Sequence, residues 1–201
     1  MKTLILARHG HAASNVADTV SCLPPGEGLS ELGMAEGAAL RTMLAEDEIG
    51  LGVTSELRRT QETLALALDG REVQTVVVPQ LNEINFGSYE GGPLAAYREW
   101  AWSTAPDAEC PGGGESRTAM ASRVASALDW LLARPDDTIL AVWHALPIRY
   151  VLEGAAGRPP PARIGTIPHA DPYRLERGDV ELAAASMRAW VLAPRFADAA
   201  A

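Results

Sequence analysis

The sequence has little of several features that mark whole classes of protein. Only two of its 201 residues are cysteines, Cys22 and Cys110, and they stand far apart, without the short spacing of a metal site. We therefore expect free thiols, which favour a reducing compartment, the cytoplasm. No apolar run approaches the length of a membrane span, and the run that ends at Arg8 is too brief for the core of a signal peptide. These features predict a cytoplasmic protein that does not act in a membrane.

Positive charge is also scarce. The chain carries 17 lysines and arginines against 26 acidic residues, which gives a formal net charge of -9. This balance disfavours general binding to nucleic acid or to anionic membranes, so we expect a small-molecule partner instead. The sequence has no internal repeat and no linker, and its length suits a single domain over residues 1–201. The oligomeric state stays open, with a homodimer as one option.

Apolar runs alternate with helical periodicities along the chain. Strands are expected at 3–7, 51–55, 73–78, 138–143, 172–175 and 187–192, and helices at 14–20, 31–44, 56–68, 115–134 and 146–152. Ser30 and Ser55 are the expected caps of the second and third helices. This alternation favours an α/β fold with three layers, in which a mostly parallel sheet is flanked by helices on both faces.

Two segments lack a clean period. Residues 84–114 are irregular and contain aromatic residues and several glycines. A long irregular piece inside a compact domain is usually functional, so we expect a small lid over the carboxyl ends of the strands. Packing among the lid's own aromatic residues is favoured over a direct role in a pocket. Residues 196–201 are expected to fray.

Five side chains that could take part in catalysis lie at or just after the ends of the expected strands. Arg8 and His9 follow the first strand, and Arg59 lies in the first turn of the helix after the second strand. Glu83 lies just past the third strand, and His144 ends the strand at 138–143. Taken alone, Arg8 and His9 could simply close a strand. Because ligands of open α/β sheets bind beyond the carboxyl ends of the strands, the five together predict an active site there.

Two arginines, two histidines and one carboxylate suit phosphoryl transfer. Guanidinium groups match phosphate oxygens and hold their charge through the transition state. A neutral imidazole can attack phosphorus and form a phosphohistidine, while a carboxylic acid protonates the leaving oxygen and then activates water. Since side chains supply the positive charge, we expect neither a metal nor a cofactor. The expected substrate is a small-molecule phosphate monoester.

These residues stand in motifs that resemble those of the histidine phosphatase superfamily, the phosphoglycerate-mutase-like proteins. The motifs are Arg8-His9-Gly10 with Asn15, Ser55 to Thr60, Leu81-Asn82-Glu83, residues 113–116, and Val142-Trp143-His144. The resemblance implies a phosphatase-type enzyme with a mostly parallel sheet and a lid that carries specificity.

The resemblance also implies a role for each matching residue. His9 would be the phosphorylated nucleophile and Glu83 the proton donor. The phosphate would be held by Arg8, Asn15, Arg59 and His144. The chain departs from the family after this first motif, since His11 and Ala12 stand where an acidic or amide residue and then a threonine are common. His11 therefore joins the candidates for substrate contact.

Other interpretations stay open at this point. A mutase would return the phosphoryl group to the bound product, although the compact lid favours transfer to water. His9 and His11 also have the spacing of a paired-histidine metal site, but such hydrolases need more ligands than four histidines readily supply. A non-catalytic module that binds a phosphorylated ligand would need neither a nucleophile nor an acid.

Overall fold

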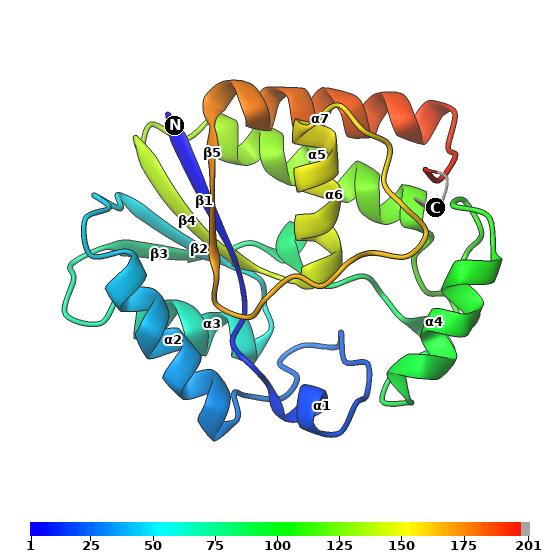
Figure 1. Ribbon diagram of the computed structural model, residues 1–201, viewed down its shortest axis with the longest axis horizontal. Helices are drawn as coiled ribbons and strands as arrows, with labels where there is room; N and C mark the ends of the chain where they lie inside the picture. Colours follow the sequence, from blue (N-terminus) through cyan, green and yellow to red (C-terminus); the bar gives the residue numbers. More distant parts are fainter. Residues whose placement is uncertain (198–201) are drawn as a thin grey trace.

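A five-stranded sheet forms the centre of the protein, in a computed structural model that describes residues 1–197. The strands are β1 (Thr3–Arg8), β2 (Leu51–Thr54), β3 (Gln74–Val77), β4 (Thr138–Trp143) and β5 (Pro172–Glu176). Their order across the sheet is β3-β2-β4-β1-β5 (Figure 1). The first four are parallel, and β5 runs antiparallel beside β1. The predicted mostly parallel sheet is therefore confirmed.

Helices cover both faces of this sheet (Figure 1). They are α1 (Ala13–Val16), α2 (Glu31–Met43), α3 (Arg58–Ala67), α4 (Leu94–Ser103), α5 (Arg117–Leu132), α6 (Ala145–Ala155) and α7 (Arg177–Leu192), with short 3-10 turns η1 (Pro79–Leu81) and η2 (Gly87–Tyr89). Helices α2 and α3 pack on one face, while α5, α6 and α7 pack on the other. This arrangement confirms the three-layer α/β fold.

Side-chain alternation along β1 explains the two layers of helices. Leu4 and Leu6 point into the core beneath α5 and α6, whereas Ile5 and Ala7 point into the core beneath α2 and α3. All four are completely buried. Successive side chains of a strand point to opposite faces, so a strand between two helical layers must be apolar at every position. The continuous apolar run before Arg8 thus places that arginine at a buried edge.

The predicted last strand, 187–192, is wrong, because these residues form the final turns of the 16-residue helix α7. Five apolar residues among six suggested a strand, but burial in α7 follows a helical period that begins well upstream. The buried positions are Val180, Ala183, Ala184, Met187 and Trp190. The helical period is visible only over the whole helix, since six residues cover less than two turns.

Several element ends also differ from the prediction. The first helix ends at Val16, since Asp18 adopts a positive φ of 52° that cannot continue a helix. Ser30 does cap α2, by accepting a hydrogen bond from the N–H of Gly33, but Ser55 does not cap α3, which begins only at Arg58.

The last described residues of the chain pack against α7. Phe196 packs near Trp190, with 6.1 Å between the ring centroids, so fraying does not begin there. The rest of the expected frayed end, 198–201, lies outside the described residues. Within residues 1–197, no helix is both long enough and apolar enough to cross a membrane.

Candidate active site

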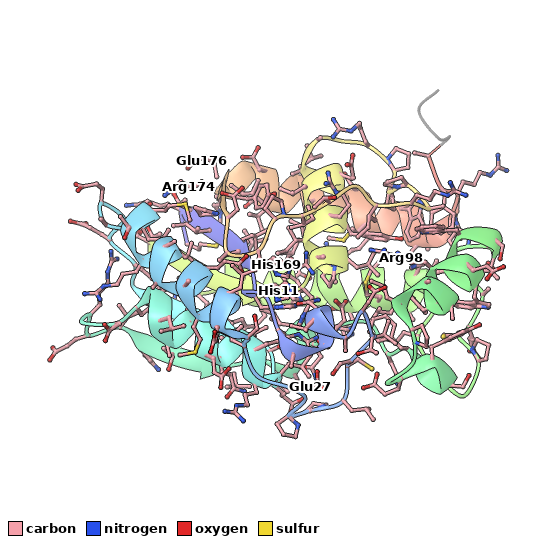
Figure 2. The ribbon with its side chains drawn as sticks, turned by 60° about the horizontal axis from the view of Figure 1, so that its bottom comes forward. His11, Glu27, Arg98, His169, Arg174 and Glu176 are labelled. Atoms are coloured by element: carbon pink, nitrogen blue, oxygen red, sulfur yellow. The ribbon has the colours of Figure 1, made fainter. Side chains whose placement is uncertain are left out.

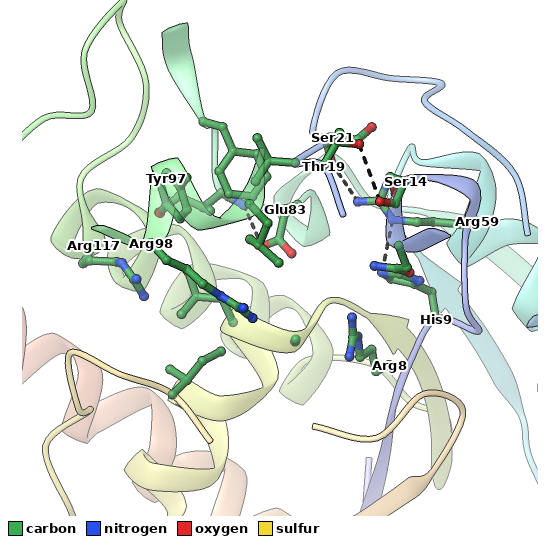
Figure 3. A pocket seen from close by; sticks show the side chains of 18 of the residues that line it. Arg8, His9, Ser14, Thr19, Ser21, Arg59, Glu83, Tyr97, Arg98 and Arg117 are labelled. Atoms are coloured by element: carbon green, nitrogen blue, oxygen red, sulfur yellow. Dashed lines mark hydrogen bonds between the residues drawn. The ribbon is translucent and has the colours of Figure 1, made fainter. Parts of the chain in front are cut away.

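A cavity of ≈ 310 Å³ opens at the carboxyl ends of the parallel strands. Six of its ionisable lining residues, from five separate parts of the chain, point into a common space (Figure 3). They are Arg8, His9, Arg59, Glu83, Arg98 and Arg117. Four of these six were predicted from their positions after strands. The volume is that of an ordinary small-ligand pocket.

His9 is held with one ring nitrogen toward Arg59. Its imidazole is 4 % exposed, and Nδ1 lies 2.8 Å from the carbonyl oxygen of Gly10. Because a carbonyl can only accept, Nδ1 carries the hydrogen and Nε2 keeps a lone pair. That lone pair accepts a hydrogen bond from Nε of Arg59 at 3.1 Å. Burial, followed by the charges of Arg59 and Arg8, holds the His9 pKa well below its ordinary 6.5. The imidazole is therefore neutral and nucleophilic at Nε2.

Two glycines let the backbone carry His9 to this position. A Cβ on Gly10 would lie 2.6 Å from the carbonyl oxygen of Gly33, and a Cβ on Gly33 would collide with the carbonyl oxygen of His11. The N–H of Gly10 donates to Oγ1 of Thr63 at 2.9 Å. The turn after β1 is thus packed directly on α2 and α3.

Arg59 reaches the same space from the second position of α3. Its side chain is 3 % exposed, and Nη2 donates to the carbonyl oxygen of Ser21 at 2.8 Å. Among the described residues, Nη1 has no hydrogen-bond partner although it is buried. An unpaired buried donor is costly, so this N–H is poised for a ligand that brings an acceptor.

His144 lies directly behind the cavity wall rather than in it. The imidazole is fully buried, and its ring centroid is 5.3 Å from that of His9. Its Nε2 lies 3.0 Å from Oγ of Ser55, and its Nδ1 lies 3.4 Å from Nη2 of Arg59. Burial and the charge of Arg59 hold the His144 pKa well below 6.5. Arg59 can only donate, so Nδ1 accepts and the hydrogen resides on Nε2.

Ser55 is the residue that fixes this tautomer. Its Oγ accepts from Nε2 of His144 and from the N–H of Leu57 at 3.2 Å, and it lies 2.9 Å from Oγ1 of Thr60. Thr60 in turn donates to the carbonyl oxygen of Leu57 at 2.7 Å. The expected helix cap is therefore a positioning residue for His144.

Arg8 contributes a second poised guanidinium. Nη1 donates to the carbonyl oxygen of Ile167 at 2.9 Å, whereas Nε is buried and, within residues 1–197, has no partner. Burial lowers the pKa of Arg8 to about 10, against the opposing charge of Glu83. The group still carries its positive charge at neutral pH.

Glu83 is the acidic residue of the cavity lining. Its side chain is 12 % exposed, and Oε2 lies 4.0 Å from Nδ1 of His144. Oε1 accepts the N–H of Ile84 at 2.9 Å. Burial raises the Glu83 pKa above 4.5, and the Ile84 hydrogen bond and the charge of Arg59 offset part of that rise. The carboxyl group is thus shifted toward the protonated form, as a general acid requires.

Two other candidates occupy different positions. Asn15 lines the cavity, and its Oδ1 accepts the N–H of Ala12 at 2.9 Å, which leaves the amide NH₂ to donate. His11 does not line the cavity. Its Nδ1 lies 3.0 Å from Oγ of Ser30, and its ring lies beside that of His169 (Figure 2). His169 donates through Nδ1 to the carbonyl oxygen of His9 at 2.8 Å, so it supports the backbone of the site.

Sequence reasoning missed two arginines of the cavity, Arg98 on α4 and Arg117 at the start of α5. Neither follows a strand, and no local pattern distinguishes them from surface arginines. The aromatic residues of segment 84–114 pack against one another, and some of them also line the cavity. Tyr97 packs on Phe86 with 4.6 Å between ring centroids and also lines the cavity, while the half-exposed Trp102 lines it as well.

Comparison with known proteins shows the family to which this chain belongs. A family model of the histidine phosphatase superfamily (branch 1) matches residues 4–187. An adenosylcobalamin/alpha-ribazole phosphatase of Salmonella typhimurium is 30 % identical over 87 % of this chain and 86 % of that protein. A metal-independent phosphoserine phosphatase of Arabidopsis thaliana is 28 % identical over 77 % and 71 % of the two chains.

A solved structure extends the likeness to the fold. The crystal structure of the alpha-ribazole phosphatase from Shigella flexneri has a TM-score of 0.75 and 26 % identity, and the match covers 87 % of this chain and 90 % of that one. Together with the match of the family model over most of the sequence, this confirms the resemblance drawn from the motifs. The chain belongs to the histidine phosphatase superfamily, branch 1, and is an enzyme of the phosphatase type.

Proposed function

We propose that this protein hydrolyses a small phosphate monoester through a phosphohistidine on His9, without a metal ion. One observation carries the proposal. Buried N–H groups of Arg8 and Arg59 have no partner among residues 1–197, and they lie beside a neutral His9 whose Nε2 holds a lone pair. A phosphoryl group placed there supplies the acceptors that both arginines lack and the electrophile that Nε2 attacks.

The first step transfers the phosphoryl group. Nε2 of His9 attacks phosphorus, the N–P bond forms and the bond to the leaving oxygen breaks. Arg8 and Arg59 hold the charge on the peripheral oxygens, and the free amide N–H of Asn15 adds a donor. Oε2 of Glu83 gives its proton to the leaving oxygen, so an alcohol departs rather than an alkoxide.

The second step returns the enzyme to its starting state. The Glu83 carboxylate takes a proton from water, the oxygen of that water attacks phosphorus, and the N–P bond breaks. Inorganic phosphate leaves, and the proton on Glu83 is restored. His144 stands behind the transferring group, where a bound dianion favours its protonated form. It can then donate through Nδ1, since Ser55 already holds the hydrogen on Nε2.

Positive side chains replace the metal in this scheme. A divalent ion would serve to neutralise phosphate charge, and here the buried Arg59 and the partly buried Arg8 supply the positive charge. The Arabidopsis relative is described as metal-independent, in agreement with this reading. We also propose that the chain is a single domain in which residues 84–114 form a lid that determines specificity. The free thiols of Cys22 and Cys110 favour the cytoplasm as its location.

A screen of phosphate monoesters, with and without exhaustive chelation, tests the proposal. We expect phosphate release with at least one alkyl and one aryl ester, unchanged by the chelator and absent in His9→Ala. Arg58→Ala is the matched control, because Arg58 is exposed, pairs with Glu62 at 2.6 Å and does not line the cavity. Full turnover by folded His9→Ala, or an absolute need for a metal ion, would refute the mechanism.

A further inference from the structure

Arg117 is a buried cation for which the described residues, 1–197, supply no counter-ion. Its side chain is 7 % exposed, and both Nε and Nη1 are buried without a hydrogen-bond partner among the described residues. None of the described carboxylates forms an ion pair with it. Buried charges are normally paired, because desolvation costs several kcal/mol per ion. Arg117 therefore needs a structural or functional explanation outside the folded chain itself.

The position of Arg117 in its helix adds to the cost. It is the first residue of α5, whose N-cap is Ser116. The N-terminus of a helix carries partial positive charge, so a cation there is disfavoured and an anion is favoured. The guanidinium and the start of a 16-residue helix thus both favour an anion in the same part of the cavity.

The neighbours of Arg117 cannot neutralise it. They are the phenols of Tyr97 and Tyr150, whose pKa values burial raises and the nearby guanidinium partly lowers. The Tyr97 hydroxyl lines the cavity and is buried without a partner among residues 1–197, whereas the Tyr150 hydroxyl lies behind the lining, close enough to the Arg117 guanidinium for that group to lower the Tyr150 pKa. Neutral phenols offer hydrogen bonds to a ligand but no charge. An anionic group beside Arg117 would supply the missing negative charge, and the Tyr97 hydroxyl, which lines the cavity, could donate a hydrogen bond to it.

A second cation reaches the same side of the cavity from the lid. Arg98 of α4 points into the cavity beside Arg117, on the side opposite His9 and Arg59 (Figure 3). The cavity is thus lined by four arginines and a single carboxylate, Glu83. A phosphate dianion can neutralise Arg8 and Arg59, but it leaves the charge of the buried Arg117 uncompensated, while Arg98 is exposed to solvent.

We propose that Arg117, assisted by Arg98, forms a second anion subsite, and that the leaving group of the substrate carries a carboxylate or a second phosphate that binds there. The identity of the substrate class rests on the proposed phosphatase function, whereas the anion subsite rests on the cavity alone. Arg117 selects the substrate and does not contact the phosphorus centre. Esters of neutral alcohols are then poor substrates compared with anionic ones of suitable length.

Matched ester pairs test this selectivity. We would compare ω-phosphonooxy alkanoates of increasing chain length with their uncharged primary amides, and alkanediol bisphosphates with the corresponding monophosphates. The wild-type enzyme is expected to prefer an anionic ester in kcat/KM by roughly 10- to 100-fold at the best length, the range of a hydrogen bond to a charged group. In Arg117→Met this ratio should fall to near one. The two series separate a carboxylate from a phosphate as the natural group.

The control variant is Arg163→Met, because Arg163 also lies near the lid, 4.8 Å from the Trp102 ring, but does not line this cavity. It should keep the wild-type ratio. The subsite would be refuted if Arg163→Met also lost the preference in kcat/KM for anionic over neutral esters, or if Arg117→Met kept it. In either case, hydrolysis of the amides would still support the proposed function. Failure of every ester would instead overturn the proposed function.

Thermal unfolding without ligand gives a readout that needs no activity. If Arg117 is unpaired until a ligand binds, Arg117→Met removes an unpaired buried charge from the ligand-free protein, and the melting temperature should rise by roughly 3–8 °C. If Arg117 holds the fold together, the melting temperature should fall, and the subsite would be refuted.

Discussion

Replacing Glu83 with glutamine would remove one titratable proton and leave the shape of the site intact. The amide oxygen can still accept the N–H of Ile84, as Oε1 does at 2.9 Å, and the NH₂ group takes the place of Oε2. The side chain is only 12 % exposed, so little solvent is present to substitute for the missing acid. The variant should therefore fold normally and fail at the proton transfer.

The size of the loss should depend on the leaving group. With an alkyl phosphate, kcat/KM should fall by roughly 10²–10⁴-fold, the usual contribution of a general acid. An aryl phosphate releases a stable phenolate, so formation of the phosphohistidine should be far less affected. Its breakdown should slow, because the same carboxylate is the proposed base for water. Rapid-mixing kinetics of Glu83→Gln should then show a burst of phenol followed by slow turnover.

The raised pKa of Glu83 also predicts the direction in which kcat/KM changes with pH. Burial raises the Glu83 pKa above 4.5, and the acid is lost as the pH increases through that raised value. For alkyl esters, wild-type kcat/KM should therefore decrease on the alkaline side, and Glu83→Gln should lack that decrease. Glu90→Gln is the matched control, since Glu90 binds the N–H groups of Cys22 and Leu23 and does not line the cavity. A burst rate reduced as much as the alkyl-ester rate would show that Glu83 is not the acid.

Three further predictions address the other parts of the site. Arg59→Ala should lower kcat/KM at least about a hundredfold for alkyl and aryl esters alike, because it acts on the phosphoryl group itself; a loss confined to one ester class in steady-state assays would contradict this. Ser55→Ala should reduce the free energy of unfolding in urea by about 1–3 kcal/mol, since it leaves the buried Nε2 of His144 unpaired, and an unchanged stability would refute the network. The free energy of unfolding should also decrease as the pH falls below about 6.5, by up to about 1.4 kcal/mol per pH unit for each buried imidazole, because the unfolded chain binds the protons that His9 and His144 exclude. Glu83 opposes this trend with its raised pKa, so denaturation curves across that range should still show a net positive slope with pH, and a flat or negative slope would contradict the assignment.

Much of the fold and of the phosphoryl site could be predicted from the sequence, for one physical reason. A strand buried on both faces must be apolar along its whole length, so the point where Arg8 and His9 interrupt the run marks the edge of the sheet. The same reasoning applies at Trp143, before His144. Parallel strands bring such ends together, and this placed residues from distant motifs in one site.

Only the tertiary structure showed which polar groups have hydrogen-bond partners, because those partners come from distant segments. Whether a donor has a partner depends on segments far away in sequence, so the sequence could not show that N–H groups of Arg8 and Arg59 have no partner in the described part of the chain. Ser55 looked like a helix cap because its partner, His144, lies 89 residues further on. In the same way, 187–192 became helix because the tertiary core buries one face of all of α7.

The sequence alone thus determined which reactive side chains gather at the sheet edge, because Arg8, His9 and His144 end buried strands and Arg59 begins the helix after another. Only the tertiary structure decided the selectivity that we propose, because Arg98 and Arg117 come from the lid and from a helix start and meet in the cavity through packing. Hydrophobic patterns specify where segments are buried, whereas the surroundings of a buried charge are set by every segment packed around it.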